Sequence, residues 1–139
     1  MTVQPRLVVD EPDTAITFYR EAFGAELTER FVDGAGVVVH ATLRLGASTV
    51  SITQAMASWR LLSPKTVGDS PVLMHLTVDD PDAACSRAVE RGSVVVIPIE
   101  NRPYGKREGR VRDPFGHLWI LSRPLEALTA AQIQERLAP

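Results

Sequence analysis

The sequence predicts an α+β fold made of two βαβββ modules in tandem, and three observations carry this prediction. Strand-like runs alternate with one amphipathic helical run in the same order in both halves of the chain. Shifting the numbering by 69, the separation of Pro81 from Pro12, lays the segment 78–84 on the segment 9–15, which indicates an internal repeat. The third observation is a hairpin signal at 113–116, because Asp113-Pro114 opens a turn and Gly116 closes it.

Bulk composition limits the class of protein. A chain of 139 residues with 45% hydrophobic and 23% charged residues suits a single packed domain. The net charge of −2 gives no electrostatic reason to expect nucleic acid or a membrane as partner. One cysteine, Cys85, excludes an internal disulfide framework and suits a reducing compartment. With no apolar signal core and no run that spans a bilayer, we expect a cytoplasmic protein.

The first module follows from the chain in order. Residues 6–9 are strand-like, and Glu11-Pro12-Asp13 opens a helix because proline suits the first helical position and acids complement the helix dipole. Apolar residues at helical spacing continue this helix to about Phe23, and Gly24 closes it. Three strands then follow, separated by turns rich in glycine: 26–32, 37–45 and 49–54.

The second module repeats this plan with strand 72–78, helix 82–91 and strands 94–99, 106–112 and 118–122. Between the modules, residues 55–70 have no period, so we interpret them as a linker or lid. A last helix begins at Thr129 and is interpreted as a packing or dimer-contact helix. We expect one domain over 1–139, with module one at 1–54, the linker at 55–70, module two at 71–123 and the C-terminal helix within 124–139.

Two such modules also predict a cavity, because a twisted sheet whose one face is covered by a helix leaves the other face free. Side by side they form a curved, open, barrel-like mixed sheet with a concave cavity. Four segments together resemble the vicinal oxygen chelate superfamily of glyoxalases, bleomycin-resistance proteins and extradiol dioxygenases, and within it the PhnB-like branch: 9–25, 40–46, Tyr104-Gly105 with Arg107, and 113–119. The resemblance covers nearly the whole chain and implies a homodimer.

The same resemblance implies where a metal ion would bind. In metal-dependent members, each module offers one ligand from its first strand and one from its last. These positions correspond here to Gln4, Ser51, Leu73 and Ile120. Leucine and isoleucine have no atom that donates to a divalent cation, so we expect no metal and no other cofactor at the family's usual site. A non-standard site from His40, His75 and Gln4 stays open as an alternative.

Without a metal, the cavity floor becomes apolar at Leu73 and Ile120, and polar side chains surround it. Pockets for small molecules have this mixture of apolar walls and a few convergent polar groups. Trp59 in the linker is suited to stack on a flat ligand. The candidate ligand-binding residues are Gln4, Arg6, His40, Ser51, Thr53, Trp59, Leu73, His75, Tyr104, Arg107 and Ile120. His40 and His75 are also the catalytic candidates, since histidine titrates near neutral pH.

The chain's one basic concentration is the run Arg102, Lys106, Arg107, Arg110 and Arg112. One interpretation is a solvated strand face. The other follows from the resemblance: Arg107 falls on the family's Tyr-Gly-x-Arg pattern, where it would guard the cavity mouth with Tyr104 and bind an anionic group bidentately.

Three further residues are interpreted as structural. Cys85 aligns with Ile16 in the repeat, on the helix face that meets the sheet, so we expect a core residue rather than a nucleophile. Trp119 has the opposite parity to Leu118 and Ile120 and is expected to pack against a helix. His117 is interpreted as a residue of the turn.

The preferred hypothesis is a metal-independent small-molecule-binding protein of the glyoxalase/bleomycin-resistance type that sequesters an aromatic or drug-like compound. The alternative is a lyase, isomerase or dioxygenase that uses a non-standard metal site or a histidine general base, so enzymatic activity stays an open question. A third hypothesis is a structural homologue with a filled cavity. Leu73 and Ile120 favour the binding protein and the structural homologue. His40 and His75 leave the enzyme hypothesis open.

Overall fold

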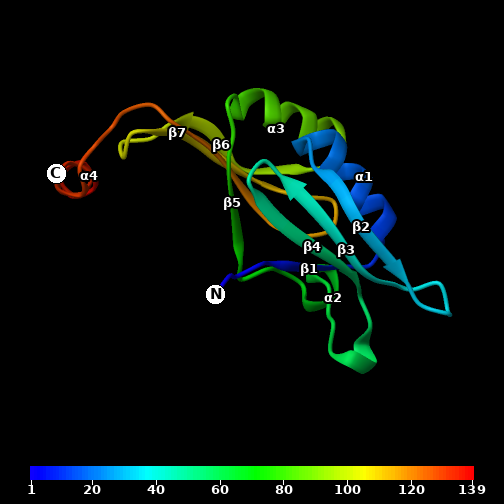
Figure 1. The fold of residues 1–139 in the computed structure, drawn as a ribbon. Helices are drawn as coiled ribbons and strands as arrows, with labels where there is room; N and C mark the ends of the chain where they lie inside the picture. The colour runs from blue at the N-terminus through cyan, green and yellow to red at the C-terminus, as the bar shows by residue number, and fades with distance from the viewer. The chain divides into compact units, whose positions relative to one another are not determined.

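The first βαβββ module forms a four-stranded mixed sheet. In the computed structural model, which describes residues 1–139, its strands are β1 (Arg6–Val9), β2 (Glu26–Val32), β3 (Val38–Leu45) and β4 (Ser48–Gln54). Their order is β1-β4-β3-β2, with β1 parallel to β4 and the other neighbours antiparallel. The strand that closes the module in sequence therefore lies beside the strand that opens it (Figure 1).

Helix α1 (Pro12–Phe23) covers one face of this sheet. Proline stands in its first turn and Gly24 adopts the left-handed conformation at its end, with φ of 70°, as the sequence predicts. Ala15, Ile16, Tyr19 and Ala22 are buried along one stripe. They form the core of the module with apolar strand residues that include Val9, Leu43 and Ile52.

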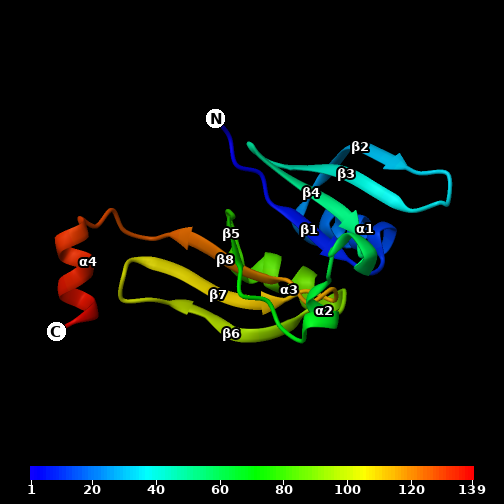
Figure 2. The ribbon, with the colours of Figure 1, turned by 90° about the horizontal axis from the view of Figure 1, so that it is seen from below.

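The second module has the same plan. Its strands are β5 (Leu73–Thr77), β6 (Val94–Asn101), β7 (Lys106–Arg112) and β8 (Leu118–Pro124), in the order β5-β8-β7-β6. Strand β5 is parallel to β8, and the register opposes His75 to Ile120 and Ile120 to Arg110. Figure 2 shows β6, β7 and β8 lying side by side in this order.

Helix α3 (Pro81–Glu90) packs against β6, β7 and β8. Asp80 caps its start by accepting a hydrogen bond from the backbone N–H of Ala83 at 3.0 Å. Ala84 and Ala88 are fully buried, and the strand residues Val111, Trp119 and Leu121 complete this core. The small alanines let the helix approach the sheet closely.

The contacts divide the chain into two units, 1–71 with 114–117 and 72–113 with 118–139. The turn between β7 and β8 therefore belongs to the first unit. Phe115 in this turn contacts Phe18 and Tyr19 of α1, with ring centroids 5.9 Å and 6.1 Å apart. His117 donates from Nε2 to the carbonyl oxygen of Val8 at 2.9 Å. Its predicted place in the turn is confirmed.

The segment between the modules is more regular than predicted. It contains a short 3₁₀ helix, η1 (Ala57–Trp59), an isolated bridge between Met56 and Leu61, and the four-residue helix α2 (Pro64–Val67). The last helix, α4 (Ala130–Leu137), has a capping box in which Thr129 and Gln132 exchange hydrogen bonds. No side chain of α4 is buried, and Figure 2 shows it standing beyond the end of β8.

The α+β class and the tandem βαβββ plan are confirmed. The predicted barrel-like sheet consists of two separate four-stranded sheets, neither closed into a barrel. Several predicted strands begin and end at the predicted residues, among them β7 at Lys106–Arg112. Strand β6, which was predicted to end at residue 99, continues to Asn101. None of the helices has the length and apolarity needed to cross a bilayer.

Candidate functional site

Each sheet turns one face away from its helix, and the predicted site residues lie mainly on these two faces. In module one, alternation points Leu7, Ala41 and Ile52 toward α1 and their neighbours away from it. Residues that stand opposite each other in the register share a face. We call the face turned away from α1 the open face of module one; its residues are Arg6, Val8, Glu29, Phe31, His40, Thr42, Arg44, Ser51 and Thr53.

A chain of polar contacts crosses the open face of module one. The guanidinium NH2 of Arg6 lies 3.1 Å from Nδ1 of His40, whose Nε2 lies 2.8 Å from the hydroxyl of Thr42. That hydroxyl donates to the carboxylate of Glu29 at 3.4 Å. Arginine has no acceptor, so Nδ1 of His40 must accept and Nε2 must carry the proton. The one lone pair with which the His40 ring could take a proton is therefore engaged by Arg6.

The remaining groups of this face are held in place. Phe31 stacks on the His40 ring, with centroids 6.1 Å apart and the planes inclined by 20°. The hydroxyls of Ser51 and Thr53 donate to the carbonyl oxygens of Pro5 and Val39, at 3.3 Å and 3.0 Å. Both residues are buried, and their hydroxyl protons are engaged by the backbone.

A pocket of about 430 Å³ lies within the first unit, between the edge of this face and η1. Its volume falls in the range of small-molecule sites. Trp59 stands on its wall with 76% of its surface exposed, although tryptophan is usually packed. The pocket combines aliphatic walls with a few polar groups: Arg6, Asp33, Val37, Val39, Thr53, Gln54, Met56, Trp59 and Leu61.

The corresponding surface of the second sheet is the open face of module two. The register and the burial pattern assign to it Leu73, His75, Thr77, Lys106, Glu108, Arg110, Arg112, Leu118, Ile120 and Ser122. The predicted residues Leu73, His75 and Ile120 thus share one face, as alternation requires. The ring of His75 is exposed.

Glu108 is the most strongly engaged polar group of the open face of module two. Its carboxylate accepts a hydrogen bond from the Ser122 hydroxyl at 2.6 Å and another from the Tyr104 hydroxyl. Burial acts to raise the pKa of Glu108, but these two bonds and the nearby His75 and Lys106 outweigh it, so the pKa lies below its ordinary value.

Tyr104 responds to the same contact in the opposite sense. Burial, the hydrogen bond to Glu108 and the negative charge of Glu108 raise the pKa of Tyr104 to about 12. Arg102 and Arg110 act against this rise. The Tyr104 hydroxyl therefore stays protonated over the physiological range and keeps donating to Glu108.

Arg107 and Tyr104 have different partners: Tyr104 donates to Glu108, and Arg107 is paired elsewhere. The Arg107 guanidinium binds both carboxylate oxygens of Asp82 in α3, at 2.7 Å and 2.9 Å, and Oδ1 of Asn101 at 2.9 Å. Arg107 therefore lies on the helix-covered face, opposite to Glu108, because neighbouring residues of a strand point to opposite faces. The ion pair between Arg107 and Asp82 lowers the pKa of Asp82 and ties β7 to α3.

The donor set does not fit the family's metal ion. Leu73 and Ile120 offer no N, O or S atom, Gln4 lies before β1 in exposed chain, and the Ser51 hydroxyl is bonded to a backbone carbonyl. No group of three histidine, cysteine, aspartate or glutamate side chains is close enough together to hold a metal ion. The alternative set of His40, His75 and Gln4 draws on both units of the chain and stays a prediction.

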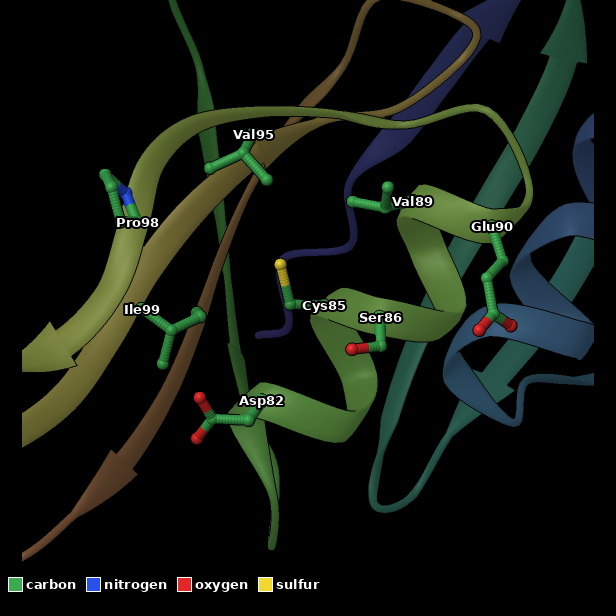
Figure 3. A pocket seen from close by; sticks show the side chains of 8 residues that line it. All are labelled: Asp82, Cys85, Ser86, Val89, Glu90, Val95, Pro98 and Ile99. Carbon is green, nitrogen blue, oxygen red and sulfur yellow. The ribbon is translucent and has the colours of Figure 1, made fainter.

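A second pocket, of about 480 Å³, lies between α3 and β6 (Figure 3). Cys85, Ser86 and Val89 of α3 line it together with Val95, Pro98 and Ile99 of β6. Cys85 is half-buried, so the prediction of a core residue holds only in part. Burial and the charge of Asp82 raise the pKa of its thiol, which keeps it protonated and a poor nucleophile.

Trp119 is a core residue, as predicted, with 2% of its surface exposed. Its indole Nε1 donates to Oδ2 of Asp113 at 2.9 Å. Asp113 is itself buried, so the contact supplies one of the hydrogen bonds that a carboxylate needs when it is removed from water. The contact ties the residue before the turn to the first part of β8.

Sequence reasoning did not single out Glu29, Glu108 and Arg110 as site residues. Alternation within β7 contains a usable signal, because Val111 is an apolar residue directed at the helix and Arg107 has the same parity. That parity assigns Glu108 and Arg110 to the open face. The contact between Tyr104 and Glu108 depends on the course of the turn, which no periodicity describes.

Comparison with known proteins agrees with this architecture. Residues 2–121 match the family model described as the Glyoxalase/Bleomycin resistance protein/Dioxygenase superfamily. Two four-stranded sheets of βαβββ plan, with site residues on the faces away from the helices, define a protein of the glyoxalase fold. The chain belongs to the glyoxalase/bleomycin resistance/dioxygenase superfamily.

Relatives at 30–37% identity span most of the chain. The uncharacterized protein Rv0887c of Mycobacterium tuberculosis is 37% identical over 139 residues, covering 98% of this chain and 82% of its own. The Arabidopsis thaliana protein At5g48480 is 30% identical over 122 residues, covering 83% of this chain and 73% of its own. The X-ray structure of the At5g48480 product has a TM-score of 0.71 at 29% identity and covers 88% of this chain and 98% of that one.

Two further solved structures are similar. TioX from Micromonospora sp. ML1 has a TM-score of 0.68 at 27% identity and covers 93% of this chain and all of its own. A PhnB protein from Bacillus cereus has a TM-score of 0.69 at 17% identity and covers 88% of this chain and 99% of its own. At that identity the PhnB protein shows the shared fold alone.

Proposed function

We propose that this protein is a PhnB-like, small-molecule-binding member of the superfamily that captures an aromatic or drug-like compound without a metal ion. The observation that carries the proposal is the replacement of donors by Leu73 and Ile120 at the family's ligand positions. A face that has lost its metal ligands to apolar residues keeps the ability to bind and loses the usual means of polarising a substrate.

The pocket beside Trp59 supports the same proposal. An exposed indole next to Val39, Met56 and Leu61 offers a flat, apolar surface to an aromatic ring. Arg6 at the pocket wall adds a cation, and Asp33 an anion, so polar substituents of the ligand also find partners. Aromatic contacts of this kind contribute about 0.5–1.5 kcal/mol beyond burial of area.

The test uses the neutral probe N-phenylnaphthylamine, whose own fluorescence rises in an apolar environment. We expect binding that quenches Trp59 and is unchanged by EDTA or by added Zn, Ni, Fe, Mn or Co. Trp59→Ala should weaken binding at least about tenfold, equivalent to 1.4 kcal/mol. Val67→Ala, which shortens another exposed apolar side chain of the same segment, is the matched control and should bind normally.

Other outcomes overturn the proposal. Stoichiometric metal uptake with a raised melting temperature, together with probe binding that needs the metal, would contradict metal independence. Equal affinity of wild type and Trp59→Ala for the probe would show that the pocket beside Trp59 is not the binding site.

A histidine general base is the second candidate function, and the structure favours His75 over His40 for it. The lone pair of His40 is engaged by Arg6, whereas the His75 ring is exposed on the same face as Glu108. Proton abstraction next to a carbonyl would appear as exchange of C–H for deuterium in D₂O, followed by NMR on a panel of oxo acids. Exchange lost in His75→Gln and kept in His40→Gln would support this function; no exchange with wild type would end it.

We also propose a homodimer. Strand β6 is the edge of its sheet and exposes Val94, Val95 and Val96. Unpaired edges with apolar side chains favour association with another chain. Light scattering over a range of concentrations should give the dimer mass for wild type and a weakened dimer for Val94→Lys, with Val67→Lys as the control. A monomer at every concentration would contradict the proposal.

A further inference from the structure

We propose that the open face of module two binds the carboxylate of an aromatic acid, with Arg110 as the residue that receives the anion. This site lies within the second unit and does not depend on the pocket beside Trp59. It goes beyond capture of an aromatic compound, because it specifies a negatively charged group and the residue that binds it.

The first observation is a donor without a partner. Nε of Arg110 is buried and makes no hydrogen bond. A guanidinium carries five N–H donors, and leaving a buried donor unpaired is unfavourable, more so when the group is charged. Folded proteins rarely leave such a group unmatched, so the orphan donor points to an acceptor that arrives from outside the chain.

Arg102 and Arg107 of the basic run differ from Arg110 in this respect, because each is paired with an acid. Arg107 is paired with Asp82, and Arg102 with Glu100. Arg102 also donates from Nε to the carbonyl oxygen of Glu108 at 3.1 Å. Their charges are committed to acids and carbonyls of the same unit. The family resemblance implied Arg107 as one candidate anion receptor, whereas the contacts favour Arg110.

The neighbouring acid does not neutralise Arg110. Glu108 lies two residues away on the same face, yet its carboxylate oxygens accept hydrogen bonds from Tyr104 and Ser122. Arg110 is not among these hydrogen-bond partners of Glu108. The negative charge of Glu108 still acts on whatever Arg110 binds, so it favours a monoanion such as a carboxylate over a doubly charged phosphate.

The register supplies the surface for the rest of the ligand. Ile120 stands between Arg110 on one side and His75 on the other, each directly opposite to it on a neighbouring strand. Adjacent strands lie about 4.8 Å apart, so the three residues form a row about 10 Å long between its outer backbones. Ile120 and the exposed Leu73 give the row an apolar floor that suits an aromatic ring.

The experiment compares two probes of the same shape, naphthoate and its neutral amide, by calorimetry on the full chain. We expect naphthoate to bind wild type, and Arg110→Gln to weaken this binding at least about tenfold. The amide should bind weakly and equally to both. Lys106→Gln removes the same charge from the same strand and face and is the matched control, with an expected loss of less than about threefold.

A second measurement needs no variant and covers the case in which Arg110→Gln fails to fold. In NMR spectra of wild type, the Arg110 Nε–H signal should move on addition of naphthoate and stay in place with the amide. An unmoved signal, equal affinity for the acid and the amide, or equal losses in Arg110→Gln and Lys106→Gln would each overturn the site. Binding of N-phenylnaphthylamine should be unchanged in Arg110→Gln, which separates this test from that of the Trp59 pocket.

Discussion

The NH2 group of Arg6 lies 3.1 Å from Nδ1 of His40, and this contact determines which ring nitrogen of His40 carries the proton. Because arginine only donates, Nδ1 accepts and Nε2 donates to Thr42. A histidine base must keep one lone pair available to its substrate. On the open face of module one, Arg6 engages the lone pair that a substrate would need.

The tautomer of His40 is the first prediction. At about pH 8, where histidine is ordinarily neutral, nitrogen-15 NMR should show the proton on Nε2 and an unprotonated Nδ1. Arg6→Met should remove the preference, because nothing then donates to Nδ1, whereas Arg44→Met on the same face should leave it intact. A proton on Nδ1 in wild type would contradict the contact.

The second prediction concerns the alkaline titration of Tyr104. Its pKa of about 12 has burial as the largest cause and the contact with Glu108 as the next. Glu108→Gln should therefore lower the pKa toward the ordinary value of 10.0 without reaching it, since burial remains. Ultraviolet absorbance of tyrosinate measures the change, and Tyr104→Phe identifies which of the two tyrosines titrates. A pKa unaffected by Glu108→Gln would show that the two side chains do not interact.

The third prediction concerns stability in acid. The folded-state pKa of Glu108 is lowered, so its contribution is present above its ordinary value of 4.5 and is lost as the pH falls through the folded pKa. Glu108→Gln should reduce the free energy of unfolding by about 1–2 kcal/mol at neutral pH and flatten its fall in acid. Urea unfolding at several pH values measures both effects.

Ser122→Ala is the control for this third prediction. It removes one hydrogen bond to Glu108 while keeping the charge, so it should reduce the stability by a smaller amount and shift the acid transition toward higher pH. A steeper acid loss in Glu108→Gln than in wild type would be incompatible with a lowered pKa.

The fourth prediction concerns the buried bond from Trp119 to Asp113. Trp119→Phe removes the donor and leaves Asp113 with one hydrogen bond fewer in the core. The free energy of unfolding should fall by about 1–3 kcal/mol, measured by urea denaturation. Trp59→Phe makes the same chemical change at a site exposed to solvent and should alter stability by less than about 0.5 kcal/mol. Similar losses in both variants would mean that the bond contributes nothing.

Much of the fold could be predicted from local signals in the sequence, namely helix caps and turns. Proline at the start of α1 and Gly24 at its end locate that helix, and β7 ends where predicted because turns bound it on both sides. The repeat gives the second module from the first. What periodicity cannot give is the separation of the strands into two sheets, since pairing across a sheet is set by contacts distant in sequence.

The candidate site was predictable only to the level of a strand face. Alternation places His75 and Ile120 together, and the register agrees. The partner of an individual side chain depends on geometry within about an ångström, so the pairing of Arg107 with Asp82 was not foreseen. The Nε atom of Arg110 lacks a partner because of how it is buried, and burial of a single atom cannot be predicted from a run of basic residues.

The turn at 114–117 has a consequence for synthesis on the ribosome. Phe115 packs on Phe18 and Tyr19, yet about a hundred residues separate it from them in the order of translation. Because synthesis proceeds at about 5–20 residues per second, the first half of the nascent chain lacks the Phe115 ring in its core for several seconds. The first half on its own is thus an incomplete folding unit, and its last core residue is delivered only as the second half is finished.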